Sequence, residues 1–342
     1  MRILQTRLGQ ERWLRFTRNR RGYISLWIFL GIFALSLVSD FVANEVPLLV
    51  WYSGRPYFPV FQSFSEKTFG GEFETDADYR DPHVQDLIRA KGWMIWPPVR
   101  MSYATINFDL PSPAPSPPTL ANLLGTDENG RDILANILYG LRISILFGFS
   151  LSILSSALGI LAGAIQGYYG GRVDILGQRF IEVWSSMPTL FVLIILASIV
   201  QPSFWWLLLI NLLFGWMGLV GLVRAEFLRA RNLEYVLAAR ALGMKDRRIM
   251  FVHMLPNAMV ASLTFLPFIL AGSIFTLTAL DYLGYGLPIG SPSLGDLLAQ
   301  AKGNLQAPWV GFSGFGATAL PLILLVFIGE GVRDAFDPRR AF

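Results

Sequence analysis

The sequence of 342 residues contains no cysteine, only two histidines and few charged residues for its length. Without cysteine there is no disulfide, no thiolate metal site and no cysteine nucleophile. His83 and His253 are too few for a multi-histidine metal or haem site. No glycine is followed by lysine, so the phosphate-binding loop Gly-x-x-x-x-Gly-Lys-Ser/Thr is missing. The chain is therefore not expected to be an enzyme, to hold a metal or to hydrolyse ATP through that loop.

Apolar residues are what the sequence has in abundance. Hydrophobic residues make up 53% of the chain and charged residues 15%, and the mean hydropathy is +0.48. Few soluble domains of this length have such a composition. We expect an all-α polytopic membrane protein with six transmembrane helices. The apolar runs that predict these helices are 23–39, 143–166, 183–200, 204–223, 258–280 and 314–328.

The charges support a topology with both termini in the cytoplasm. The short outer connections hold only Lys302 as a basic residue, whereas the inner ones are rich in arginine. The basic segment 1–22 is then a cytoplasmic N-terminus before a retained first helix, because no clean signal-peptide cleavage site follows it. The basic residues expected inside after that helix are Arg172, Arg179, Arg224, Arg229, Arg231, Arg240, Lys245, Arg247, Arg248, Arg333, Arg339 and Arg340.

The segment 40–141 differs from the rest of the chain and is expected outside the membrane. Up to Arg131 its acidic residues outnumber its basic ones, and prolines cluster in 111–118, which favours an extended polyproline strut. Apolar residues such as Trp93 provide enough surface for a small packed module. We predict an extracytoplasmic insertion between the first and second helices, followed by a five-helix core over 142–342.

The basic connection 224–257 is the largest cytoplasmic loop that this topology predicts. A short helix is favoured before Gly243, which supplies a helix stop that tolerates positive φ. Ala238 and Ala239 leave room for another protein to approach the helix backbone. Pro256 marks the start of the next apolar run, since proline is tolerated in a first helical turn. From these residues two interpretations stay open: a docking helix, or a solvated loop helix whose arginines only follow membrane topology.

A second motif lies just before the second predicted helix, and we call residues 124–134 the lead-in segment. Its glycines permit tight turns, and its acids and arginine are expected to cross-link the turn by charge-assisted hydrogen bonds. This turn chemistry favours a rigid start of the helix over a direct role in transport. The residues concerned are Gly125, Thr126, Asp127, Gly130, Arg131 and Asp132.

Small residues repeat every four positions along the second predicted helix. Such ridges let helices pack closely in lipid, and packing accounts for them without a role in conduction. Pro267 and Pro321 lie inside the fifth and sixth predicted helices, where each removes a backbone hydrogen bond and is expected to kink its helix. The small residues are Ser155, Gly159, Gly163 and Gly167 on one ridge, and Gly148, Ser152 and Ser156 beside it.

The two motifs together resemble ABC importer permeases of the dipeptide, oligopeptide and nickel family. In that family the coupling loop reads Glu-Tyr-Val, Ala-Ala-Arg-Ala-Leu-Gly, His and Leu-Pro-Asn, and the lead-in reads Leu-Gly-Thr-Asp and Gly-Arg-Asp. One position departs from the pattern, because Leu237 stands where glutamate is frequent. The matching coupling-loop residues are Glu234, Tyr235, Val236, Ala238, Ala239, Arg240, Ala241, Leu242, Gly243, His253, Leu255, Pro256 and Asn257.

The resemblance extends from Leu124 onward and implies the type I importer permease fold in a bacterial cytoplasmic (inner) membrane. It implies ATP-driven uptake of peptides or peptide-like solutes, with the short helix before Gly243 docking on an ATPase. Arg240 would either pair with that ATPase or anchor the loop. The long insertion is similar to that of the second permease of Yej-type importers, which are associated with oligopeptide and microcin C uptake.

The resemblance also implies partners. They are a second, related permease subunit, an ATP-binding cassette ATPase that uses ATP and Mg, and an extracytoplasmic solute-binding protein. This chain would sit in the lipid bilayer, bind no cofactor itself and have no nucleic acid partner.

Two other functions stay open on the residues alone. An ion-coupled secondary transporter would need coupling charges in the middle of the membrane, and few ionisable residues lie inside the predicted helices. A membrane sensor or scaffold would use the outer segment as a receptor and would accumulate no solute.

Overall fold

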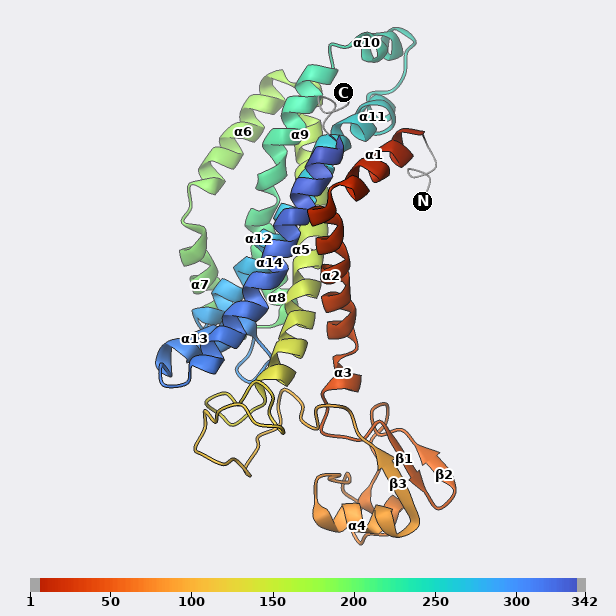
Figure 1. The fold of residues 1–342 in the computed structure, drawn as a ribbon. Helices are drawn as coiled ribbons and strands as arrows, with labels where there is room; N and C mark the ends of the chain where they lie inside the picture. The colour runs from red at the N-terminus through yellow and green to blue at the C-terminus, as the bar shows by residue number, and fades with distance from the viewer. Residues whose placement is uncertain (1–6, 337–342) are drawn as a thin grey trace.

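The computed structural model describes residues 7–336, so Arg339 and Arg340, which the sequence assigns to the cytoplasm, lie outside the described part. The helices run along one long axis (Figure 1). α10 (Glu234–Ala241) and α11 (Asp246–Arg248) lie at one end, and a small β-sheet lies at the other. We call these the α10 end and the sheet end.

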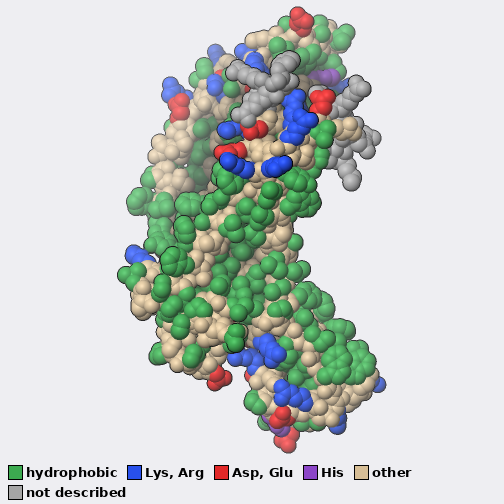
Figure 2. All heavy atoms as spheres, in the orientation of Figure 1, with side chains coloured by type: hydrophobic (Ala, Val, Ile, Leu, Met, Phe, Trp, Pro, Cys, Tyr) green, Lys and Arg blue, Asp and Glu red, His purple; other side chains and the backbone are tan. Residues whose placement is uncertain are grey.

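Within residues 7–336, five helical stretches are long and apolar enough to span a membrane, and a sixth span forms if the bent pair of α6 and α7 is counted. Hydrophobic side chains cover the middle of the long axis (Figure 2). The predicted all-α polytopic fold is confirmed. The spans are α2 (Arg20–Leu37), α5 (Ile133–Tyr169), α6 (Gly171–Ser185) with α7 (Thr189–Ile199), α8 (Phe204–Gly215) with α9 (Met217–Ala230), α12 (Leu255–Tyr282) and α14 (Pro308–Phe336).

The third span differs from the straight helix that the sequence predicts over 183–200. α6 begins at Gly171, inside a stretch predicted as a loop, and α7 begins only at Thr189. The two helices are bent by 68° at the break between them. Pro188 lies in this break, and because proline lacks a backbone N–H it interrupts the helical hydrogen bonds there.

α5 is packed against α9 through the predicted glycine ridge. A Cβ atom on Gly163 would lie 2.7 Å from the Val220 carbonyl oxygen, and one on Gly167 would lie 2.6 Å from the Arg224 carbonyl oxygen. Gly159 meets the carbonyl of Trp216, the residue that caps α9, in the same way. Any larger side chain would push the two helices apart, so the ridge serves close helix packing.

Small residues also join α5, α12 and α14. The Ser152 and Ser273 hydroxyl oxygens lie 3.2 Å apart between α5 and α12. A Cβ atom on Gly148 of α5 would lie 2.6 Å from the Ile274 side chain, and Gly329 of α14 is equally close to the Phe268 ring of α12. Between these helices the small residues make room for the side chains of the facing helix.

The insertion folds as a small module at the sheet end, which the sequence predicts, but its sheet is a new finding. The sheet is antiparallel with the strand order β2-β1-β3. Phe69 is fully buried and packs edge-on against Tyr52, Tyr57 and Tyr79. The elements are α3 (Ser39–Val42), β1 (Leu49–Tyr52), β2 (Arg55–Tyr57), the 3₁₀ helix η2 (Glu66–Phe69), α4 (Pro82–Lys91) and β3 (Gly92–Ile95).

One acidic residue joins the base of this module to the bundle. Asp40, in α3, accepts a hydrogen bond from the Arg142 guanidinium at 2.6 Å and another from the Tyr139 hydroxyl at 2.9 Å. Both donors belong to α5. The module is thus tied to the central helix close to the point where the chain leaves α2.

Candidate coupling surface and lead-in segment

α10 is the short helix that the sequence predicts before Gly243. It begins at Glu234 and ends at Ala241, and Gly243 has a φ of +73°. This left-handed conformation favours glycine because other residues carry a Cβ that clashes with the backbone. A Cβ atom on Gly243 would meet nothing else within 4 Å. The glycine is therefore required by the turn itself, and the space around it is open.

The helix has one buried and one exposed face. Val236 is fully buried and packs in a cluster with Phe227 and Ile249. On the outward side, Leu242 is 81% exposed and Leu237 is 50% exposed. The exposed residues of this region, which we call the α10 face, are Glu234, Tyr235, Leu237, Ala238, Arg240, Ala241, Leu242 and Gly243.

The structure corrects the joint assignment of the two alanines. Ala238 is exposed, but Ala239 is buried in the same cluster as Val236. Adjacent residues on a helix point about 100° apart, so the two methyl groups do not share one face. Ala239 lets α10 approach the chain's own core, and Ala238 alone leaves room on the outside.

Arg240 anchors α10 to α5. Its guanidinium carbon lies 4.9 Å from the centre of the Tyr168 ring, within the range of a cation–π contact. The Tyr168 hydroxyl donates to the Asp246 carboxylate at 2.5 Å, and Asp246 begins α11. Of the two roles that the sequence leaves open for Arg240, these contacts support the anchor.

The loop joins the fifth span through a π-helical segment, η3 (Ile249–Met254). Leu255 begins α12 and Pro256 lies in its first turn, as predicted. Leu255 packs against the cluster that supports α10, whereas Pro256 is exposed. The Nε2 atom of His253 is buried without a hydrogen-bond partner in the described residues. Because π segments are costly and are found often at functional sites, this junction is a candidate site of movement.

The lead-in segment at the sheet end is a buried turn. Thr126 is fully buried, its N–H donates to the Ser116 carbonyl at 2.9 Å, and its hydroxyl accepts from the Ser116 N–H at 2.8 Å. Asp127 is also fully buried, and its Oδ1 accepts from the N–H groups of Asn129 and Arg131 at 2.9 and 2.8 Å. These bonds fix the backbone of the turn on the proline-rich segment 111–118. That segment bends over 111–115, so the extended strut that the sequence favours does not form.

Asp132 then starts α5. Its Oδ1 accepts from the Ala135 N–H at 2.8 Å as a helix cap, and its Oδ2 accepts from the Asn122 side chain at 2.8 Å. Gly125 has a φ of +78°, and a Cβ atom there would lie 2.8 Å from a carbon of the Trp309 ring. The rigid start of the helix that the sequence favours is confirmed by this geometry.

The predicted cross-link through arginine is wrong. Within residues 7–336 no salt bridge joins Arg131 to Asp127 or Asp132, and the buried Arg131 Nε has no hydrogen-bond partner. Both acids bind backbone N–H groups instead, two to four residues ahead in the chain. A short carboxylate side chain reaches such nearby N–H groups easily. Gly130 has a φ of +78° and completes the turn.

Burial dominates the electrostatics of the lead-in segment. Removal from water raises the pKa of the Asp127 carboxyl above its ordinary value, against the opposing effect of the backbone N–H groups of Arg131 and Asn129. Burial raises the pKa of Asp132 in the same way, although Ala135 and Asn122 donate to it. Two buried carboxyl groups held by backbone amides indicate a structural role.

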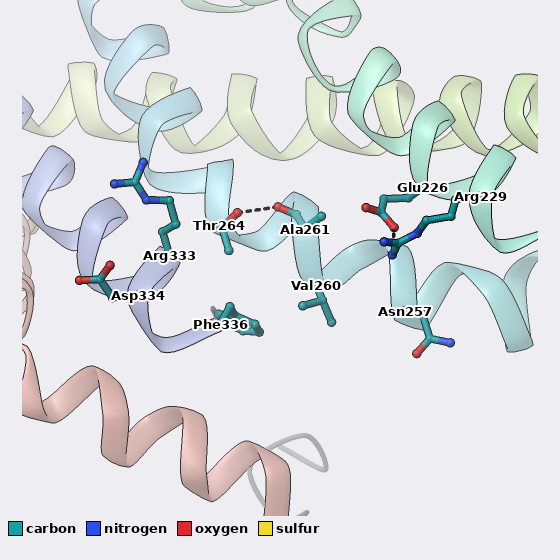
Figure 3. Close-up of a pocket in the computed structure, with 9 residues that line it drawn as sticks. All are labelled: Glu226, Arg229, Asn257, Val260, Ala261, Thr264, Arg333, Asp334 and Phe336. Atoms are coloured by element: carbon teal, nitrogen blue, oxygen red, sulfur yellow. Dashed lines mark hydrogen bonds and ion pairs between the residues drawn. The ribbon is translucent and has the colours of Figure 1, made fainter. Parts of the chain in front are cut away.

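A cavity of about 520 Å³ at the α10 end lies between α9, α12 and α14 and was missed in the sequence. It contains the ion pair of Glu226 with Arg229, at 2.7 Å, together with Arg333 and Asp334 (Figure 3). The Asn19 side chain also donates to Asp334, at 3.2 Å. No local sequence pattern indicates a cavity that forms where the ends of three helices meet. The only signal in the sequence is the general excess of charged residues at the inner ends of the spans.

Comparison with protein families decides the class of the molecule. Residues 133–342, from the start of α5, match the family described as "Binding-protein-dependent transport system inner membrane component". The chain belongs to this family. It is a multi-pass inner membrane protein of a transporter permease family, which is not itself a family of enzymes. Residues 7–68 match a second family, described as "N-terminal TM domain of oligopeptide transport permease C".

Named relatives agree with the family and with the resemblance read from the motifs. The chain is 62% identical to "Inner membrane ABC transporter permease protein YejE" of Escherichia coli (strain K12), over 98% of each chain. It is 55% identical to "Peptidoglycan transport system permease protein YejE" of Agrobacterium fabrum, over 97% of this chain and 93% of the relative. It is 33% identical to "Oligopeptide transport system permease protein OppC" of Bacillus subtilis, over 70% of this chain and 78% of the relative. The suspected Yej-type peptide permease is therefore confirmed as the kind of protein that this chain is.

Proposed function

We propose that this permease subunit carries peptides or peptide-like solutes inward and that the α10 face receives the force from an ATP-binding cassette ATPase. The α10 end is then cytoplasmic, together with both termini. The partners are the ATPase, which binds ATP and Mg, a second permease subunit and an extracytoplasmic solute-binding protein. No cofactor is assigned to this chain.

The single observation that carries the proposal is the contrast between the two faces of α10. The outward face exposes Leu237 and Leu242, while the inward face is held by Val236. Exposed apolar residues grouped on a well-anchored helix make this face a candidate protein contact site. Arg240 and the buried cluster hold α10 in place. A displacement of the α10 face would therefore also displace the residues that α10 packs against.

That support leads directly into the membrane. Val236 packs with Ile249 and Met254 of η3, and η3 continues into α12. Tyr168, which holds both Arg240 and Asp246, lies in the last turn of α5. Movement of α10 would therefore reach α5 and α12 together. Alternating access follows if these two spans rotate when the ATPases close and return after hydrolysis.

The solute is proposed more narrowly from the relatives. Their names give oligopeptide transport in one case and peptidoglycan transport in another. Oligopeptides are the first choice, and microcin C is a candidate as a peptide-like solute. Uptake of a labelled oligopeptide by cells that carry the chain, measured with competing microcin C or peptidoglycan fragments, distinguishes these solutes by which one lowers the uptake.

The test of the coupling surface is Gly243→Asp, assayed for uptake and for copurification of the ATPase. A Cβ atom on Gly243 meets nothing within 4 Å, and the added carboxylate places a charge on the α10 face. We expect normal amounts in the membrane, at least tenfold lower uptake and loss of the ATPase from the purified complex.

Gly284→Asp is the matched control. Gly284 has a φ of +79° and an equally open environment, but it follows α12 at the sheet end. It should keep the ATPase bound. Normal uptake by Gly243→Asp would remove the coupling assignment. Uptake that survives ATP depletion but stops with a proton uncoupler would instead favour a secondary transporter, and no accumulation of any solute would favour a sensor or scaffold.

A further inference from the structure

The exposed side of the first span continues past the end of α2. A row of exposed residues follows α2 at intervals of three or four, which is the spacing of one helix face. Val38 keeps nearly helical dihedral angles, with φ −98° and ψ 22°, so the row passes into α3 and reaches Phe41, which is 43% exposed. The row consists of Ile24, Ile28, Gly31, Leu35, Val38 and Phe41.

α2 by itself is short for a bilayer. Without Arg20 and Arg21 at its start, its 18 residues leave 16, which rise about 24 Å at about 1.5 Å each. The hydrocarbon core of a bilayer is about 30 Å thick. The residues that follow α2, up to Phe41, therefore lie where acyl chains meet headgroups. Asp40 at this depth binds Arg142 of the bundle, and Phe41 beside it remains exposed.

A turn of the insertion lies against Phe41. The Phe61 ring packs edge-on against the Phe41 ring, with the ring centroids 5.7 Å apart. Phe61 nevertheless remains 74% exposed and Phe58 48% exposed. The Phe61 N–H donates to the Phe58 carbonyl at 3.1 Å, and Pro59 follows Phe58, a position where tight turns favour proline. We call residues 58–61 the phenylalanine turn.

The phenylalanine turn projects from a folded base. Tyr57, directly before it, and Phe64, three residues after it, pack edge-on with ring centroids 5.2 Å apart. Both rings pack against the buried core of the insertion. Between Arg55 and Glu66 the sequence has no charged residue, although the insertion as a whole is rich in acids. The turn can therefore enter a membrane boundary without burying a charge.

We infer that the phenylalanine turn dips into the leaflet at the sheet end, with Phe58 and Phe61 between the headgroups and the acyl chains. Phenylalanine on the apolar side of a membrane-surface element is typical of this boundary. Lipid is favoured over a protein as the occupant because the turn packs on a row of residues that already spans the membrane, at the depth where α2 ends.

The insertion therefore rests on the membrane surface and does not extend freely from it. Hydrophobic side chains continue from the bundle onto the right-hand side of the insertion (Figure 2). The inference requires only that the chain spans a membrane, so it does not depend on the solute or the ATPase.

The test places one spin label on the turn, which is straightforward because the chain has no cysteine. The full-length chain is reconstituted in bilayer discs, and the accessibility of the label to oxygen, which concentrates in lipid, is compared with its accessibility to a water-soluble nickel chelate. We expect the ratio of oxygen to nickel accessibility to be at least about threefold higher in Phe61→Cys than in Phe73→Cys.

Phe73 is the matched control, because it is 62% exposed in the same insertion but lies between Glu72 and Glu74. Ile28→Cys, in the exposed row of α2, gives the ratio for a label among acyl chains. Should Phe61→Cys not fold, Phe58→Cys is measured in its place.

Two outcomes would overturn the inference. Equal ratios in Phe61→Cys and Phe73→Cys would place the turn in water. Low accessibility to both reagents, in the chain alone or in the complete importer, would show that protein and not lipid covers the turn.

A second label tests whether the two phenylalanines hold the turn in the membrane. The label is placed at the exposed Gln62 by Gln62→Cys. Adding Phe58→Ser with Phe61→Ser should raise its nickel accessibility at least about twofold, because the apolar surface that enters lipid is lost. Adding Phe73→Ser instead should leave it unchanged. A Gln62 label that keeps its depth without the two phenylalanines would contradict the inference.

Discussion

The α10 face and the lead-in segment are both sequence motifs built on a glycine with positive φ, yet they differ in every physical respect. Gly243 has open space around it, whereas Gly125 is packed against Trp309. Thr126, Asp127 and Asp132 of the lead-in segment are buried and bind backbone groups of this chain. Most of the α10 motif points outward and binds nothing described. A motif that is satisfied internally serves the fold, and one that is left unsatisfied indicates a partner.

We expect the largest difference in stability between these two regions when Gly125 and Gly243 are each replaced by alanine. Gly125→Ala forces a Cβ against Trp309 and the Ser116 carbonyl in addition to the strained φ, and should cost about 3 kcal/mol of folding free energy. Gly243→Ala carries only the strain of φ, about 1 kcal/mol. Thermal unfolding of the purified variants checks both. Equal losses would mean that packing around Gly125 does not matter.

The next effect concerns the helix cap of α5. Asp132→Ala removes the bond to the Ala135 N–H and leaves the buried Asn122 amide with only the Met101 sulfur, at 3.2 Å, as acceptor, at a cost of about 2 kcal/mol. Ser203→Ala is the control, because Ser203 caps α8 through the exposed Trp206 N–H at 3.2 Å. The control should lose about 0.5 kcal/mol. A melting temperature of Asp132→Ala as high as that of the control would contradict the structural role of the lead-in segment.

A smaller effect on stability, with a large effect on transport, is expected at the α10 face. Leu242→Ser changes a side chain that is 81% exposed, so the free energy of unfolding should move by less than about 0.5 kcal/mol. Uptake should nevertheless fall at least fivefold if the α10 face is a docking surface. Leu120→Ser, at a leucine that is 98% exposed near the sheet end, should leave uptake unchanged. Uptake and thermal unfolding of both variants distinguish a docking surface from a solvated loop.

The sequence predicted features that depend on local pattern. Apolar runs located the spans, and Gly243 located the end of α10 to within two residues. The break at Pro188 carried a local signal that a hydropathy average hides, because residues 183–200 are apolar on both sides of it. The positions of the α10 motif were correct, but which of Ala238 and Ala239 faces outward depends on where the core lies.

Features that depend on distant contacts were not predictable. In the insertion, Leu49 of β1 pairs with Ile95 of β3, and strands of three or four residues are too short to show an alternating pattern. The cavity at the α10 end arises where helices from different parts of the chain meet. Arg131 illustrates the same limit, because its charge predicted an ion pair that the buried acids satisfy through the backbone instead.

The smallest effect is a dependence on pH that belongs to the lead-in segment. Because burial raises the pKa of Asp127 in the folded chain, the folded state binds a proton more tightly than the unfolded state does. Stability from this group is therefore greatest at low pH and is lost as the pH rises through the folded pKa. Asp127→Asn removes the titration, so the stability of the natural chain relative to the variant should increase as the pH is lowered from 7 toward 4. Thermal unfolding of the two chains across that range gives the sign of the change in their stability difference. If the natural chain instead loses stability relative to the variant on acidification, the fold stabilises Asp127 in its charged form. That result would be expected of an exposed motif that binds a partner, not of a buried turn.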